Sequence, residues 1–210
     1  MAFRDTSTLF RIQGQGFDKP LPMKILNIED KSRSSLLSWR GQFSPQLIEA
    51  LLSAYCPENS VVLDPFSGSG TVLYEAAHFG NAACGVELNP SAWILSRIYQ
   101  LMNYDVQRRD MLLRGVKESI ISRFPEPELL YSSNDAIDVE QFREDVQFIG
   151  DRLSEDERII FDVFVILLDI ANNRVTLKHI HDTFYRIRAL LQRLPFCSKS
   201  VIAFLADARS

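Results

Sequence analysis

The 210-residue sequence lacks the features of several protein classes. It has three cysteines, Cys56, Cys84 and Cys197, which are widely separated and form no CxxC pair. This odd, scattered set argues against a disulfide framework and against a zinc site, and it fits a reducing compartment, so we expect a cytoplasmic protein. The first residues contain no apolar core behind a basic end, and they therefore do not resemble a secretory signal.

A membrane-spanning run and an excess of basic residues are missing too. The longest apolar stretch, residues 159–171, is interrupted by Asp162 and Asp169 and is shorter than the roughly 20 residues that span a bilayer. We therefore expect a buried helix there and no membrane partner. Lys and Arg number 23 against 27 for Asp and Glu, which gives a net charge of -4. A self-sufficient nucleic-acid binder has the opposite balance, so any contact with DNA needs a local patch or a partner.

The centre of the chain has the pattern of a βαβ unit. Residues 61–63 (VVL) are a short apolar run typical of a buried parallel strand, and a glycine-rich loop, residues 64–71 (DPFSGSGT), follows them. We predict a helix over residues 72–79 that Gly80 ends, and then a strand over residues 82–86 that leads to Glu87. Strand, helix and strand within about 30 residues match the length of a βαβ unit.

Helices are predicted on both sides of this unit. Ser44 and Pro45 have the residue types of an N-cap and a first helical position, for a helix that ends near residues 56–57. Further helices are expected at residues 93–102, 111–124, 139–153, 154–171 and 176–194, and an apolar strand at residues 200–206. The predicted divisions are an irregular N-terminal arm (1–40), a core (41–98), a helical insertion (99–198) and a third core strand with the chain end (199–210).

The glycine loop predicts a ligand site, because glycines between a buried strand and a helix let the main chain approach a ligand closely. A dinucleotide fingerprint would need a third glycine at position 73, where the sequence has Leu73, and this disfavours nicotinamide and flavin cofactors. Asp64 and Glu87 each end a strand. The Asp64 carboxylate suits the cationic methionine part of S-adenosylmethionine, and Glu87 suits ribose hydroxyls.

Residues 64–71, with residues 41–45 (GQFSP) and 85–90 (GVELNP), resemble the N-terminal half of the amino-group DNA methyltransferases, which make N6-methyladenine or N4-methylcytosine. The resemblance covers residues 36–98 and 199–210. It implies an α/β fold with a partial class I methyltransferase (Rossmann-like) sheet, strands one to three, and a large helical insertion. We expect three layers, with adenine and cytosine both open as targets.

The resemblance also implies where S-adenosylmethionine binds. Residues 42–45 would lie beside the methionine part, the 64–71 loop would wrap the cofactor, Glu87 would bind the ribose, and the chain end would approach the adenine. A remnant that binds no cofactor, or another nucleotide, stays an alternative. The predicted cofactor-binding residues are Phe43, Ser44, Pro45, Asp64, Pro65, Phe66, Ser67, Gly68, Ser69, Gly70, Thr71, Glu87, Leu88, Asn89, Asp207 and Ala208.

No catalytic residue is predicted in the chain. The family's catalytic loop, at the end of its fourth strand, has Asp, Asn or Ser followed by Pro-Pro and an aromatic residue, and the sequence contains no such tetrapeptide. The sequence ends about where the family continues towards strand four, which pairs with strand one. Strand one would then present an apolar edge that invites association.

These observations predict a split methyltransferase that is inactive without its partner. A second polypeptide would carry the catalytic loop and the target-recognition region, and DNA would bind through the complex. Two alternatives stay open: half of an RNA base methyltransferase, and a non-catalytic remnant that self-associates as a homodimer.

Several other groups have a structural and a functional interpretation. We predict no metal site, because residues 178–182 (KHIHD) show no third ligand, and favour a solvated helix face. The helices around Asn172 and Asn173 have two interpretations, a plain hairpin with a polar face and a helix-turn-helix that contacts DNA. We favour the plain hairpin. The basic residues near this hairpin are Arg174, Lys178, Arg186, Arg188 and Arg193. Two further sets of residues each have two possible roles. One set would contact substrate phosphates or only solvate the N-terminal arm: Lys31, Arg33, Trp39 and Arg40. The other would lie in the core or at an interface with the partner: Phe161, Phe164, Val165 and Leu168.

Overall fold

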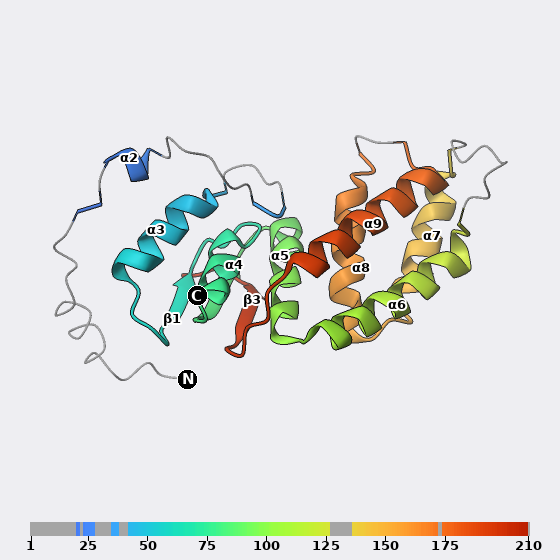
Figure 1. The fold of residues 1–210 in the computed structure, drawn as a ribbon. Coiled ribbons are helices and arrows are strands. Elements are labelled where there is room, and N and C mark those ends of the chain that lie inside the picture. Colours follow the sequence, from blue (N-terminus) through green and yellow to red (C-terminus); the bar gives the residue numbers. More distant parts are fainter. Residues whose placement is uncertain are drawn as a thin grey trace.

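The structure is a computed structural model, and it describes residues 20–21, 23–27, 35–37, 42–126, 136–171 and 174–209. Within these residues the chain forms an α/β part, built on a three-stranded sheet, and a group of helices beside it (Figure 1). Lys31, Arg33, Trp39, Arg40 and the Asn172–Asn173 pair lie outside the described residues.

The α/β part follows the predicted order of elements. Its elements are α2 (Met23–Leu26), α3 (Pro45–Tyr55), β1 (Val61–Asp64), α4 (Thr71–His78), β2 (Ala82–Glu87), α5 (Pro90–Arg97), a 3-10 helix (Ile98–Asn103) and β3 (Val201–Leu205). The single turn of α2 lies in the arm that the sequence predicts to be irregular. The predicted helix at residues 93–102 is divided differently, because the chain tightens to 3-10 geometry at Ile98.

Local sequence signals set several of these boundaries, and those at Ser44 and Gly80 were predicted. The Ser44 hydroxyl accepts a hydrogen bond from the Leu47 N–H at 3.2 Å and caps α3, with Pro45 at the first helical position. Gly80 follows α4 with a φ of 74°, a left-handed conformation that glycine adopts without strain. The Asn89 side chain accepts from the main chain of Ser91 and caps α5.

The three strands are parallel, and β2 lies between β1 and β3. Strands one to three of the predicted sheet are therefore all present, in adjacent positions. The register places Leu63 beside Cys84 and Cys84 beside Ile202. Because residues in register on parallel strands point to the same side, these three side chains share one face of the sheet.

Helices cover only one face of this sheet within the described residues. Ala83, Val201 and Ala203 are buried on the face packed against α4, α5 and the 3-10 helix. On the opposite face, Val61 is 74% exposed and Leu63 is 61% exposed. Ile202 and Phe204 of β3 are exposed there too. The prediction of three layers is therefore not met within the described residues. This part of the chain has two layers, because no described helix packs on the second face of the sheet.

The two edges of the sheet also differ. On β3, the outward N–H of Val201 donates to the Asn103 side chain at 3.0 Å, and that of Ala203 donates to Gln100 at 3.2 Å. The Trp93 indole N–H donates to the Ala203 carbonyl at 3.1 Å. No described strand pairs with the outer edge of β1, so Val61 and Leu63 present main chain as well as apolar side chains there.

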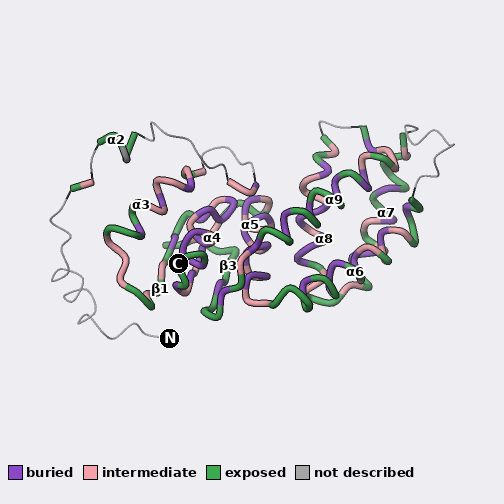
Figure 2. The backbone as a smooth tube through the Cα atoms, in the orientation of Figure 1, coloured by how far each residue is buried: buried purple, intermediate pink, exposed green. Residues whose placement is uncertain are grey.

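The helical part comprises α6 (Val106–Arg123), α7 (Val139–Gly150), α8 (Glu155–Leu168) and α9 (Leu177–Arg193). Helix α8 packs against α5, α6 and α9, and joins both parts into one core (Figure 2). Phe161, Phe164 and Leu168 are fully buried and Val165 is partly buried, which confirms them as core residues. None of the described helices combines the length and the apolar character needed to cross a membrane.

The histidines of α9 serve the packing of this part. His181 is buried, and its Nε2 lies 3.0 Å from the Phe124 carbonyl oxygen; the Nε2 of His179 lies 2.9 Å from the Leu168 carbonyl oxygen. Each ring nitrogen must donate, since a carbonyl oxygen only accepts. The prediction of a solvated face is therefore wrong for His181. Among the described residues, no three His, Cys, Asp or Glu side chains gather as metal ligands would.

Candidate cofactor site

The carboxyl ends of the three strands bring the predicted acidic residues to one edge of the sheet. Asp64 ends β1, Glu87 ends β2, and Asp207 follows β3. The Ala206 N–H donates to the Glu87 carbonyl at 3.1 Å, which holds the end of β3 beside the end of β2. In parallel sheets, ligands bind outside this end of the strands.

The glycine loop lies directly over the end of β2. The Ser67 N–H donates to the Val86 carbonyl at 3.0 Å, and a Cβ on Gly85 would stand 2.8 Å from that of Ser67. Gly70 has a φ of 90°, and a Cβ there would meet the Tyr99 ring at 2.7 Å. The loop thus needs glycine at Gly70 for its backbone and at Gly85 for its contact with the strand.

Glu87 ties the loop to the end of β2. One carboxylate oxygen accepts from the Gly68 N–H at 2.7 Å, and the other accepts from the Asn89 N–H at 2.8 Å. A carboxylate offers about four acceptor positions, so each oxygen retains capacity for a further donor. Glu87 can therefore support the loop and still accept hydrogen bonds from a pair of ligand hydroxyls.

Asp64 is a buried carboxylate beside a second one. The pKa of Asp64 lies above its ordinary value of 3.8, chiefly because the carboxyl is buried. The Phe66 N–H donates to this carboxylate at 3.0 Å and lowers the pKa in part, and the negative charge of Glu87 raises it. Two neighbouring carboxylates, one of them buried, make a site that favours a cation. This is the electrostatic character expected for a sulfonium or ammonium ligand.

Large apolar side chains are exposed in the segments predicted to contact the cofactor. Phe43 precedes α3, Phe66 belongs to the glycine loop, and Leu88 follows β2. Each is solvent-exposed although it lies within a segment predicted to contact the cofactor. Binding sites for small molecules combine apolar walls with a few placed polar groups, and this arrangement has both.

Some predicted residues have their polar groups engaged within the protein. The side chains of Ser44 and Asn89 cap α3 and α5. The carboxylate of Asp207 accepts from Arg209 through both oxygens, at 2.9 and 2.6 Å, and these bonds hold the pKa of Asp207 below its usual range. Asp207 therefore lies at the expected edge with a neutralised charge.

The structure adds residues that the predicted set omits. The Ser69 hydroxyl donates to the Gln42 side chain at 3.0 Å, and this bond links the segment before α3 to the glycine loop. Gln42 is one of residues 42–45, which the resemblance places beside the methionine part, although the list of predicted cofactor-binding residues omits it. Tyr99, whose buried ring packs on Gly70, had no signal in the sequence, because it lies in a helix 29 positions along the chain.

The comparisons with known proteins bear on this same region. A family model described as DNA methylase, of the N6/N4 type, matches residues 7–96. This segment is similar to the N-terminal portion of the amino-group DNA methyltransferases. The matched segment contains the whole glycine loop, Glu87 and most of α5.

A curated relative agrees with the family match. The type II methyltransferase M.MjaII of Methanocaldococcus jannaschii is 26% identical over 102 residues, which are 48% of this chain and 19% of that protein. The matched methylase region thus spans about a fifth of the relative's length. No solved structure matches the chain.

Proposed function

We propose that the α/β part binds S-adenosylmethionine and serves as the cofactor-binding part of an amino-group DNA methyltransferase. The observation that carries the proposal is the meeting of Asp64 and Glu87 across a glycine loop at the carboxyl end of the sheet. The DNA methylase match and the similarity to a type II methyltransferase support DNA as the substrate, at adenine N6 or cytosine N4.

The residues present suit this cofactor part by part. Asp64 offers a negative charge to the cationic methionine end, Glu87 offers acceptors to the ribose hydroxyls, and Phe43, Phe66 and Leu88 offer apolar surface. When bound, S-adenosylmethionine supplies a methyl group on a positively charged sulfur. The side chains of this chain hold and orient that group, which is the positioning contribution to catalysis.

The target amine needs further groups that the 210 residues do not contain. In the family, the catalytic tetrapeptide accepts hydrogen bonds from the amine and stacks on the flipped base. We assign this loop, the target-recognition region and the main DNA contacts to a second polypeptide. The enzyme is therefore proposed to be inactive without that partner.

The sheet offers a surface for such a polypeptide. The free edge of β1 can accept a parallel strand, and the apolar face that includes Val61, Leu63, Ile202 and Phe204 can accept helices. A partner that supplies both would complete a sheet covered on its two faces, the arrangement usual for parallel sheets.

As part of the same proposal, the enzyme acts in the cytoplasm within a restriction-modification system.

Calorimetric titration with S-adenosylmethionine tests the cofactor site. The unaltered chain is expected to bind, and Asp64→Ala and Glu87→Ala are expected to lose detectable binding while circular dichroism shows an unchanged fold. Glu58→Ala is the matched control, because Glu58 is an exposed acid at the opposite end of β1. Equal affinity in all four proteins would refute the site, and absence of binding to the unaltered chain would favour a cofactor-free remnant.

Methyl transfer tests the split enzyme. The chain is mixed with the product of the adjacent open reading frame, and transfer of labelled methyl groups to DNA and to RNA is followed. Transfer to DNA only in the mixture supports the proposal, and transfer to RNA instead supports the RNA alternative. A homodimer that the second protein does not disrupt, with no transfer, supports the self-associated remnant.

A further inference from the structure

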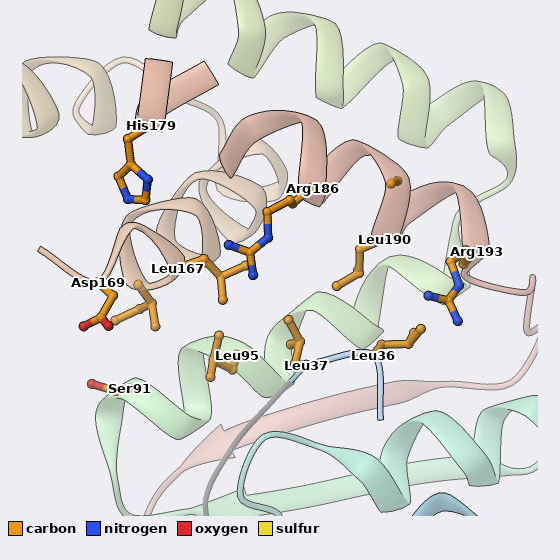
Figure 3. A pocket seen from close by; sticks show the side chains of 12 residues that line it. Leu36, Leu37, Ser91, Leu95, Leu167, Asp169, His179, Arg186, Leu190 and Arg193 are labelled. Atoms are coloured by element: carbon orange, nitrogen blue, oxygen red, sulfur yellow. The ribbon is translucent and has the colours of Figure 1, made fainter. Parts of the chain in front are cut away.

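A second candidate ligand site lies in the helical part. A cleft of about 820 Å³ opens between α5, α8 and α9, and Leu36 and Leu37 of the N-terminal stretch contribute to its wall (Figure 3). None of the predicted cofactor-binding residues lines it. Its volume lies within the range of pockets that hold small organic ligands.

The cleft combines aliphatic walls with polar groups at defined places. Leu95 comes from α5, Leu167 from α8 and Leu190 from α9, so the apolar surface is contributed from several sides. In Figure 3, Ser91 and Asp169 lie at one end of the cleft, and Arg193 lies at the other. A ligand that fills the cleft must therefore have an apolar middle and two chemically different ends.

Two arginines give the cleft its positive charge. Arg186 and Arg193 are seven residues apart on α9, so they lie about two turns apart on one side of the helix. In Figure 3 the guanidinium of Arg186 points into the cleft. Neither arginine forms an ion pair with an acidic side chain among the described residues. A guanidinium is suited to phosphate because its planar donors match the phosphate oxygens.

We propose that this cleft binds a nucleotide unit, with the phosphate at Arg186 and Arg193 and the base against the leucines. Sugar hydroxyls would supply donors to the Asp169 and Ser91 end. A phosphate attached to an acyl chain fits less well, because burying those polar groups against hydrocarbon is costly. The nucleotide is either free or one unit of a nucleic-acid strand. This inference uses none of the residues on which the proposed cofactor site depends.

Calorimetric titration of the full chain with thymidine 5′-monophosphate tests the cleft, because a pyrimidine nucleotide differs from the adenosine of the proposed cofactor. Binding is expected, and thymidine and inorganic phosphate are each expected to bind about tenfold more weakly or not at all. A titration with a short thymidine oligonucleotide identifies the source: tighter binding than the mononucleotide indicates a strand, and weaker binding indicates a free nucleotide.

The double variant Arg186→Gln with Arg193→Gln is expected to weaken binding of the mononucleotide by about tenfold or more. Arg188→Gln is the matched control, since it removes an exposed arginine of the same helix that does not line the cleft. Equal weakening in control and double variant, or no binding of any thymidine probe by the unaltered chain, overturns the proposal. Titration of the same proteins with S-adenosylmethionine separates this result from the cofactor site, because its affinity is expected to be equal in all three.

Discussion

The two outer edges of the sheet differ in whether their main-chain groups form hydrogen bonds. On β3, side chains of the 3-10 helix and α5 engage the outward main chain, and on β1 no described residue does so. The faces repeat the contrast, since one packs on helices and the other exposes apolar side chains. The closed side stabilises the fold of this chain, and the open side is a surface on which another polypeptide would gain the same kinds of contact.

The largest effect is expected on the closed side, at Asn103. Its amide donates to the carbonyls of Cys197 and Lys199 and accepts from the Val201 N–H. Asn103→Ala removes three hydrogen bonds, so the free energy of unfolding is expected to fall by about 3 kcal/mol. Urea unfolding measures this. Gln192→Ala, an exposed substitution on α9, is the control and should stay within about 0.5 kcal/mol; a similar loss in both variants would contradict the assignment.

Asp64 ends β1, where the open edge of the sheet meets the candidate cofactor site. Because the pKa of Asp64 is raised above 3.8, its folded carboxyl protonates more readily than the unfolded one. Stability due to this group therefore decreases as pH rises from 3.8 through the raised pKa. A cationic ligand prefers the carboxylate, so S-adenosylmethionine affinity should fall by about tenfold per pH unit below that pKa.

Calorimetry across this pH range tests the dependence. Asp64→Asn should bind weakly with little change over the same window. If the unaltered chain binds with the same affinity throughout, Asp64 does not face the positive charge.

The open face can be monitored through Cys84. This side chain lies on the uncovered side of β2, in register with Leu63 and Ile202, and burial raises the pKa of its thiol. At alkaline pH, alkylation of Cys84 should proceed in the isolated chain and become slower when the proposed partner is bound. Cys56, at the end of α3, serves as the internal control. Mass spectrometry resolves the two sites, and an unchanged Cys84 rate in an active complex would show that the partner binds elsewhere.

The smallest change in stability is expected at the open edge itself. Leu63→Lys should alter the free energy of unfolding by no more than about 0.5 kcal/mol, because the side chain is already largely in solvent. The same substitution should prevent a partner strand from pairing, since it places a charge in the new interface. Val106→Lys is matched, because Val106 is also 61% exposed but lies on α6. Size-exclusion chromatography of the mixtures compares their assembly, which should fail for Leu63→Lys alone.

Local chemistry explains how much of this architecture the sequence predicts. The N-cap at Ser44 and the stop at Gly80 depend on residues within one turn, and both were predicted. The start of α5 was predicted at residue 93, whereas the helix begins at Pro90 with Asn89 as its cap. The glycine loop and its flanking strands likewise form a contiguous signal. The core assignment of Phe161 and Phe164 was confirmed because helical spacing alone places them on one side of α8.

The features that escaped prediction depend on contacts between distant segments. The side chains of Gln100 and Asn103 accept hydrogen bonds from the outer edge of β3, about a hundred residues away along the chain. No local sequence pattern assigns them that role. His181 is buried because α9 lies against the end of α6, which its polar neighbours in sequence do not reveal. The three expected layers followed from the resemblance to the methyltransferase family, and no described helix packs on the second face of the sheet.

The helical insertion has a consequence for how the sheet forms. Ala83 of β2 pairs with Val201 of β3, although the whole helical part separates them in sequence. Closing so long a loop from a disordered chain is slow and entropically costly. The bonds from Asn103 to Cys197 and Lys199 bring the two ends of the insertion together. Once the helices have folded, β2 and β3 meet as if they were near neighbours, so refolding should show the helices forming before the sheet.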